Sequence, residues 1–489
     1  MNNVHALEFL CEAGRYVYNY ENRAKKDEAA FVKAVEQFKQ ADTIIFNSMI
    51  TNEEAMILQK LKERHGHKLV NKEAKKFREF LDNFASVSAK RLYRGNLDRI
   101  ESCDAVIVLG SSVSTDNPMV RLSLETAHNE RNAYISYMHS CEDESLKNVI
   151  TQFVKYEVGS EEGLIAMLAE LIVNEEGKEK YKSFFDDLDV GYICGESSVG
   201  EEEFEGMHQE LLSHEQPVLL VGSDLFNHPR SKNIAKILGM ISKYSELEIF
   251  IIPPEANTLG VALICDLDEE PEGKTVGYNV KADYTLSCLG DGDLDIPALC
   301  QQEGTFTSVD KRVVPLSITA DFEGYRLNDI SNALGVEAER TIDYTAKLPV
   351  SSGYKAVRFD DLESSGYELE NLDVQSEDES IENVDDISEF NGTVIYRCNH
   401  PLYQFNPYSS KAHKIEGDLV LLGSKQFATA ARIKADTMVR FEMDGKTYQR
   451  KFKVSDGLKG TIAYNSVFDS TDNYDEYRYK RVKLEEVDE

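Results

Sequence analysis

The side chains of this chain that could act as nucleophiles or metal ligands do not form a familiar catalytic pattern. The eight cysteines are scattered without a CxxC pair, and the ten histidines are dispersed. His65-Gly66-His67 could suggest a metal pair, but it lacks a third ligand, and solvent exposure is the simpler interpretation. The segment 195–200 misses the Gly-x-Ser-x-Gly spacing of a nucleophile elbow, and no Walker loop occurs. The sequence therefore predicts no nucleophilic or nucleotide-hydrolysing chemistry.

Two glycine-containing turns are better candidates for binding a ligand. Gly110 follows the apolar run 104–109 and precedes a helix predicted from about Met119. Gly222 follows the apolar run 217–221 and also precedes a predicted helix. A glycine lets backbone approach a ligand, and a helix N-terminus favours an anion. The alternative at both positions is a Rossmann-like turn with nothing bound, and the residues alone leave this open.

Repeated strand–turn–helix segments predict the α/β fold that would position these turns. The first has the apolar strand 43–46, then a capping box at Thr51 and Glu54, and a helix that ends at Gly66. The segments around Gly110 and Gly222 repeat this order, and residues 248–252 and 260–264 add predicted strands. Such repetition predicts one or two mainly parallel sheets covered by helices.

The chain changes character towards its C-terminal part. Residues 359–390 hold thirteen acidic side chains and neither Lys nor Arg, which predicts a mobile linker; an acidic segment that docks on a basic neighbour is the alternative. From residue 391 the pattern alternates as in β-strands. Residues 439–454 predict a β-hairpin whose tight turn is Asp444-Gly445.

Size and charge exclude several classes of protein. The length of 489 residues predicts roughly three domains of ~150 residues. The net charge of −33 argues against nucleic-acid binding and against docking on anionic lipid, but permits basic protein partners. The apolar stretch 163–173 is too short for a membrane span and contains Glu170. The scattered cysteines are typical of a reducing cytoplasm.

The most informative segment is Gln301-Gln302-Glu303-Gly304-Thr305-Phe306, followed closely by Lys311-Arg312-Val313. It resembles a signature of the molybdopterin oxidoreductase superfamily. Its Gln-Gln form is most similar to the molybdopterin-related subunit family of NADH:quinone oxidoreductase, respiratory complex I. Residues 51–61, 423–434 and 458–469 resemble segments of that family in the same order. For the motif alone, a glycine-centred turn between two strands is the alternative.

The resemblance covers most of the chain and implies its architecture. It implies interleaved doubly wound α/β domains of molybdopterin-oxidoreductase type, followed by a small C-terminal β-barrel. The expected parts are an N-terminal α/β segment (1–100), a second, Rossmann-like domain (101–255), a return to the first domain (256–358), an acidic linker (359–390) and the β-barrel (391–489).

The resemblance also implies cofactor sites, but this chain lacks some of the residues that these sites need. Leu10-Cys11 through Arg15 resembles an element whose cysteine is the last of four ligands of an iron–sulfur cluster. No cysteine precedes Cys11, and the next is Cys103, so Cys11 is an orphan or a ligand completed by another polypeptide. In the superfamily, turns like those at Gly110 and Gly222 lie against the pterin cofactor. Residues 67–100 show no motif for a molybdenum ligand, so molybdopterin is not expected and no cofactor site is complete.

Two functions from different classes follow from the resemblance. The first is a structural scaffold in the peripheral arm of an NADH:quinone oxidoreductase-type complex, not catalytic alone. Its partners would be the other subunits, including an iron–sulfur subunit, on the cytoplasmic side of the inner membrane. The second is a molybdopterin-dependent oxidoreductase subunit, similar to formate dehydrogenase.

Overall fold

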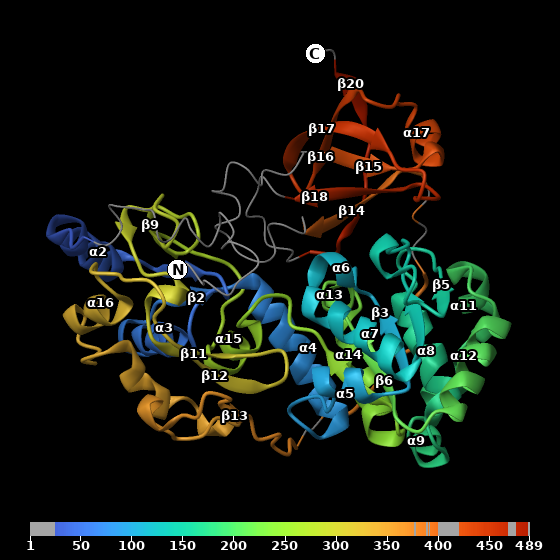
Figure 1. Ribbon diagram of the computed structural model, residues 1–489, viewed down its shortest axis with the longest axis horizontal. Helices are drawn as coiled ribbons and strands as arrows, with labels where there is room; N and C mark the ends of the chain where they lie inside the picture. Colours follow the sequence, from blue (N-terminus) through green and yellow to red (C-terminus); the bar gives the residue numbers. More distant parts are fainter. Residues whose placement is uncertain are drawn as a thin grey trace. The chain divides into compact units, whose positions relative to one another are not determined.

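The computed structural model of the chain describes residues 25–375, 378–387, 390, 392–399, 420–467 and 476–487. They fold into two compact units that each use separate stretches of chain (Figure 1). Unit 1 comprises the described residues up to 78 together with 253–372, and unit 2 comprises 79–252 and the described residues from 373 onward. The boundary between the first stretches of the two units falls within helix α4 (Lys72–Ser88).

Unit 1 is built on a five-stranded parallel sheet. Its order is β10 (Leu294–Asp295), β9 (Tyr284–Ser287), β8 (Thr275–Tyr278), β1 (Thr43–Phe46) and β2 (Lys68–Val70). Helix α3 (Asn52–His65) begins at the predicted capping box, in which Thr51 and Glu54 exchange hydrogen bonds, and ends at left-handed Gly66. These local predictions are confirmed.

The rest of unit 1 consists of short elements. The unit contains three further helices, α2 (Glu28–Gln40), α15 (Thr258–Ile264) and α16 (Leu327–Ala333). It also contains a small antiparallel sheet of β11 (Gly304–Thr307), β12 (Arg312–Leu316) and β13 (Tyr367–Glu368). Four 3-10 turns complete it: η2 (Leu299–Gln301), η3 (Thr341–Lys347), η4 (Val350–Ser352) and η5 (Phe359–Asp361).

The prediction of a strand at residues 260–264 is wrong, because these residues belong to helix α15. All seven residues of this helix are buried, so it has no polar face. A short apolar run of this kind does not distinguish a buried strand from a buried helix. Gly260 is needed there, since a Cβ would lie 2.2 Å from the Asn257 amide oxygen and 2.3 Å from that of Asn52.

Unit 2 contains a second five-stranded parallel sheet, which confirms the α/β class. Its order is β5 (Gln152–Val154), β4 (Tyr134–Met138), β3 (Ala105–Leu109), β6 (Pro217–Val221) and β7 (Glu248–Ile251). All residues of β3 and β4 are buried, as expected for strands covered on both faces.

The helices of unit 2 connect these strands. They are α5 (Leu97–Ser102), α6 (Val113–Asp116), α7 (Pro118–Arg131), η1 (Glu144–Leu146), α8 (Glu161–Ile172), α9 (Glu175–Lys180), α10 (Lys182–Asp186), α11 (Val190–Ser197), α12 (Glu201–Ser213), α13 (Ser223–Phe226) and α14 (Ser231–Tyr244). The helix predicted from about Met119 starts one residue earlier, at Pro118, where a missing N–H costs no hydrogen bond.

The C-terminal part of unit 2 is a curled, seven-stranded mixed sheet. Its order is β19 (Tyr479–Arg481), β14 (Val394–Asn399), β18 (Ile462–Val467), β15 (Val420–Gly423), β17 (Lys446–Val454), β16 (Met438–Met443) and β20 (Glu485–Val487), with helix α17 (Lys425–Ala431) beside it. The Asp444-Gly445 hairpin is confirmed, with φ of +52° and +73°. Among the described residues β19 and β20 each pair with one strand, so these strands form a half-barrel where a small β-barrel was expected.

The acidic segment 359–390 makes more specific contacts than a mobile linker requires. Its first part contains η5 and β13 of unit 1. Asp373 forms an isolated β-bridge with Lys90 and an ion pair of 2.6 Å with its ammonium group. Residues 378–387 belong to unit 2 and lie against its α14 region through hydrogen bonds and ion pairs. Acidic composition alone did not predict these contacts, because their partners are distant in the sequence.

Candidate functional site

The carboxyl ends of three neighbouring parallel strands bring polar residues together in unit 2. Gly110 follows β3, His139 follows β4, and Gly222 follows β6. Because the last residues of these strands are in register, the residues that follow meet at one edge of the sheet. Strands β4 and β5 extend the sheet on one side of β3, and β6 and β7 on the other. This edge is therefore the topological switch point, where open α/β sheets usually bind ligands.

Gly110 and Gly222 allow their turns to pack closely within the protein. A Cβ on Gly222 would lie 2.2 Å from the Ser111 Cβ and 2.4 Å from the carbonyl oxygen of Gly110. Gly110 has φ of +68°, and its Cβ would lie 2.9 Å from the Leu225 side chain. The space that each glycine leaves is thus filled by the protein's own atoms.

The guanidinium group of Arg478, which precedes β19, fills the centre of this edge. Arg478 is 1% exposed, and it donates to the two carboxylate oxygens of Asp116 at 2.7 Å each and to Asp224 at 3.2 Å. It also lies over the Tyr396 ring, 4.9 Å from the centroid. Burial lowers the pKa of Arg478, but the two carboxylates outweigh burial and raise it. A buried charge is tolerated when it is paired in this way.

His139 forms the second cationic position at the edge. Its Nε2 atom lies 3.2 Å from the Asp224 carboxylate and 3.2 Å from the Tyr479 hydroxyl. Burial lowers the pKa of His139, yet the hydrogen bond with Asp224 outweighs it and raises the pKa to about 10. The edge therefore holds two cations, Arg478 and His139, and two carboxylates, Asp116 and Asp224, which neutralise one another.

These residues do not fit an anionic pterin cofactor. Its phosphate groups would meet the carboxylates of Asp116 and Asp224, which repel anions. Arg478 and His139 are already paired with those carboxylates. Donors in an anion site point at the ligand, whereas these side chains point at carboxylates of the protein itself. We therefore derive no chemical step through a pterin at Gly110 and Gly222.

A carboxyl–imidazole pair, Glu161 and His228, is buried in the same unit. Glu161 accepts a hydrogen bond of 2.8 Å from the Tyr477 hydroxyl, and its other oxygen lies 3.5 Å from His228 Nε2. The Nδ1 atom of His228 accepts from the Arg230 N–H, so neutral His228 carries its proton on Nε2. Burial raises the pKa of Glu161 to about 7 and lowers that of His228 to about 4. Within this pair, only Glu161 changes its charge near neutral pH.

Gly304 to Phe306 of the Glu-Gly-Thr-Phe segment lie in strand β11, which is tied to the start of α3 in unit 1. Glu53 accepts from the Thr305 N–H at 2.6 Å, from the Thr305 hydroxyl at 2.8 Å and from the Thr345 hydroxyl at 2.8 Å. Asn52 donates to Thr305 Oγ1 at 3.0 Å. Burial raises the pKa of Glu53 despite these bonds. Residues 304–307 are thus a strand rather than a turn, and the motif has a packing role here.

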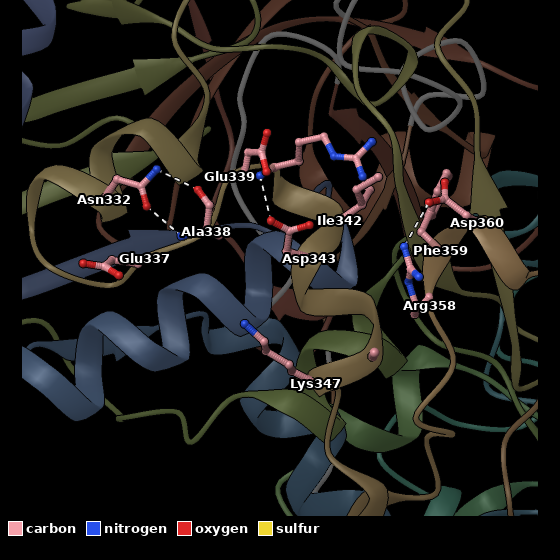
Figure 2. Close-up of a pocket in the computed structure, with 12 residues that line it drawn as sticks. Asn332, Glu337, Ala338, Glu339, Ile342, Asp343, Lys347, Arg358, Phe359 and Asp360 are labelled. Atoms are coloured by element: carbon pink, nitrogen blue, oxygen red, sulfur yellow. Dashed lines mark hydrogen bonds and ion pairs between the residues drawn. The ribbon is translucent and has the colours of Figure 1, made fainter.

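An open groove of about 570 Å³ lies at the surface of unit 1. Figure 2 shows charged side chains of both signs along it, from the segments around η3 and η5. Asp343 accepts from the backbone N–H of Arg340 at 3.0 Å, and Arg358 lies 3.6 Å from Asp360. Because the charges are mixed and partly paired, the groove favours neither anions nor cations, and we assign no chemistry to it.

The other predicted ligand positions are not brought together. Cys11 lies outside the described residues, so its role as a cluster ligand stays a prediction. His65 and His67 each hydrogen-bond a backbone carbonyl at 2.9 Å; His67 is buried, so its expected exposure is wrong. Within the described ranges, no three His, Cys, Asp or Glu side chains gather as a metal site. No helix in those ranges could cross a membrane.

Sequence reasoning missed the charged residues at the edge of unit 2. His139 comes directly after a buried strand, which is the same signal that singled out Gly110. Asp224 lies in the predicted Gly222 turn and could have been found there. Arg478 had no such signal, because it is 362 residues from Asp116 and lies beside a short strand.

Comparison with known proteins shows which fold the chain resembles but does not show its activity. Acetylene hydratase from Pelobacter acetylenicus matches with a TM-score of 0.65 and 6% identity, over 90% of this chain and 81% of that one. A chain of the formyltransferase/hydrolase complex from Methylorubrum extorquens matches with a TM-score of 0.44 and 9% identity, over 63% and 94%. No protein-family profile or curated protein matches the sequence. The chain therefore has a fold similar to that of acetylene hydratase.

Proposed function

We propose that the chain is a structural subunit of an NADH:quinone oxidoreductase-type respiratory complex. It would be a scaffold of the peripheral electron-transfer arm without a complete redox site of its own. The observation that carries this proposal is the filling of the sheet edge of unit 2 by Arg478 and its carboxylate partners. An edge closed by an internal ion pair supports packing and assembly rather than cofactor chemistry.

The sequence motifs supply the family in this proposal. Gln301 to Phe306 and the C-terminal segments resemble the molybdopterin-related subunit family of complex I, and β11 is joined to α3 through Glu53 and Thr305. The partners would be the other subunits of the complex, including one that carries iron–sulfur clusters. Cys11 would complete a cluster only together with such a subunit. The chain would then lie peripherally on the cytoplasmic side of the inner membrane.

The alternative function is a molybdopterin-dependent oxidoreductase subunit. The fold similarity to an enzyme, acetylene hydratase, over 90% of the chain supports it. In that case an anionic cofactor at Gly110 and Gly222 would require Arg478 to leave Asp116 and Asp224. This rearrangement would break a buried ion pair, which typically costs several kcal/mol.

Purification of the tagged full chain from its native membranes would separate the two functions. We expect other subunits of a quinone-reducing complex to co-purify with it, without molybdenum or tungsten in the isolated chain. We also expect Cys11→Ser to lower the iron content of the assembled complex and to leave the isolated chain unchanged. Stoichiometric molybdenum or tungsten together with a pterin would overturn the proposal in favour of the alternative.

A further inference from the structure

Residues 378–387, here called the acidic strap, lie along unit 2 in an extended form without helix or strand. The strap reads Asp-Glu-Ser-Ile-Glu-Asn-Val-Asp-Asp-Ile. A solvated acidic loop needs no specific partners for its backbone. The strap has several, and they come from side chains on α8, α11 and the α14 region.

Buried side chains hydrogen-bond the backbone of the strap. Asn233 donates to the carbonyl oxygen of Glu382 at 2.9 Å and accepts from its N–H at 2.8 Å, as a neighbouring β-strand would. Glu162 accepts from the N–H of Asp385 at 3.1 Å. With the strap in place, Asn233 and Glu162 are only 4% and 3% exposed, so its release would exchange these buried hydrogen bonds for bonds to water. Tyr192, which is more exposed, accepts from the N–H of Ile387 at 3.1 Å.

Cations bind the acidic side chains of the strap. Arg230 pairs with Glu382 at 2.6 Å, donates to the carbonyl oxygen of Asn383 at 3.0 Å, and is oriented by Glu162. The remaining ion pairs join Lys236 with Asp378 at 2.8 Å, Lys243 with Glu379 at 3.9 Å, and Lys180 with Glu379. This concentration of positive charge stands out in a chain of net charge −33.

We propose that Glu162, Tyr192, Arg230 and Asn233 form a recognition groove for an extended acidic peptide, and that the strap is its ligand held within the same chain. The backbone contacts tolerate different side chains, whereas Arg230 and the lysines select for acidic ones. Peptides are bound in this way when main-chain hydrogen bonds give affinity and flanking side chains give selectivity. A tethered ligand has an effective concentration in the millimolar range, so an acidic peptide from a partner can enter only after the strap has left.

Hydrogen exchange of the wild-type full chain provides the first test. We expect the amides of Glu382 and Asp385 to be protected, and Asn233→Ala to remove most of this protection. Lys232→Ala is the matched control, because Lys232 lies on the same helix, is 70% exposed and pairs with Glu79. Unprotected amides in the wild type, or equal loss in both variants, would overturn the proposal.

Peptide binding provides the second test. A full-length variant with Glu379→Lys and Glu382→Lys should release the strap and uncover the groove. A fluorescent peptide of residues 378–387 should then bind at least about tenfold more tightly than to the wild type, and more weakly at high salt. Addition of Asn233→Ala should abolish this gain. Equal binding to wild type and variant, or equal binding of a peptide with its acids changed to amides, would contradict the proposal. If the variant does not fold, the exchange experiment decides.

Discussion

Arg478 and Asp116 are joined by two hydrogen bonds of 2.7 Å although 362 residues separate them in the sequence. Both groups come from the same unit: Arg478 directly precedes β19 of the half-barrel sheet, and Asp116 ends helix α6, which follows β3. Asp224, in helix α13 after β6, shares the same guanidinium group. The ion pair therefore joins three parts of unit 2 at the edge where such folds usually bind ligands.

Removal of the Arg478 charge should strongly destabilise unit 2. In Arg478→Met, Asp116 loses its cation and Asp224 keeps only His139, and we expect a loss of about 3–5 kcal/mol in the free energy of unfolding. Arg440→Met removes an exposed pair with Glu485 and should cost only about 0–1 kcal/mol. Urea unfolding of both variants would check this. Equal losses would mean that the buried pair has no special weight.

The stability of the protein should depend on the protonation of Glu161. Its carboxyl has an ordinary pKa of 4.5 in the unfolded chain and a pKa of about 7 in the fold, raised by burial. The folded state therefore retains a proton that the unfolded chain loses between these values. The resulting stabilisation is full below about pH 4.5, is lost as the pH rises through about 7, and amounts to at most about 3 kcal/mol.

Glu161→Gln should remove this pH dependence. The unfolding free energy of the wild type, relative to that of the variant, is expected to fall as the pH rises across the same window. His228 titrates in both proteins, so the comparison cancels most of its contribution. Glu157→Gln, at an exposed position nearby, is the control and should keep the wild-type pH dependence. Parallel curves for wild type and Glu161→Gln would contradict the assignment.

The Glu-Gly-Thr-Phe segment should be sensitive to the loss of one hydroxyl group. Thr305→Val keeps the shape of the side chain but removes one buried hydrogen bond from Glu53 and one from Asn52. We expect a loss of about 1–3 kcal/mol in the free energy of unfolding. Thr319→Val removes an exposed hydroxyl and should have a smaller effect. A neutral result for Thr305→Val would show that the network is not needed for stability.

Gly222 should not tolerate even a methyl group. In Gly222→Ala the new Cβ would lie 2.2 Å from the Ser111 Cβ, so the two turns must move apart and thermal stability should fall. Gly195→Ala lies in helix α11 with no atom within 4 Å of the new Cβ. It should be neutral or slightly stabilising, by up to about 1 kcal/mol. Thermal melting of the two variants would distinguish them.

The features that sequence predicted correctly are those fixed by neighbouring residues. Thr51 and Glu54 bond each other across one helical turn, Gly66 ends the same helix, and Asp444-Gly445 supplies the two positive φ angles of a hairpin. Each depends on a few adjacent residues, so local spacing was sufficient. The repeated strand–turn–helix segments gave the parallel sheets for the same reason.

Features that depend on distant contacts could not be predicted in this way. Residues 260–264 belong to a helix that is buried on all sides, and a short apolar run does not distinguish such a helix from a buried strand. The acidic strap is held by Arg230 and Asn233. These residues lie some 150 positions earlier in the sequence, so local patterns could not reveal the contact. The position of Arg478 between Asp116 and Asp224 follows from tertiary packing alone.

The order of synthesis gives the Arg478 ion pair a consequence for folding. Chains emerge from the ribosome N-terminus first, and folding can begin on the part already made. Asp116 and Asp224 are therefore present long before residue 478 is synthesised. Until then, Asp116 lacks its cation and must stay hydrated, because burial without a cation is too costly. We expect the edge of this sheet to exclude water only after Arg478 has been made, and a chain stalled before that residue to retain an open edge.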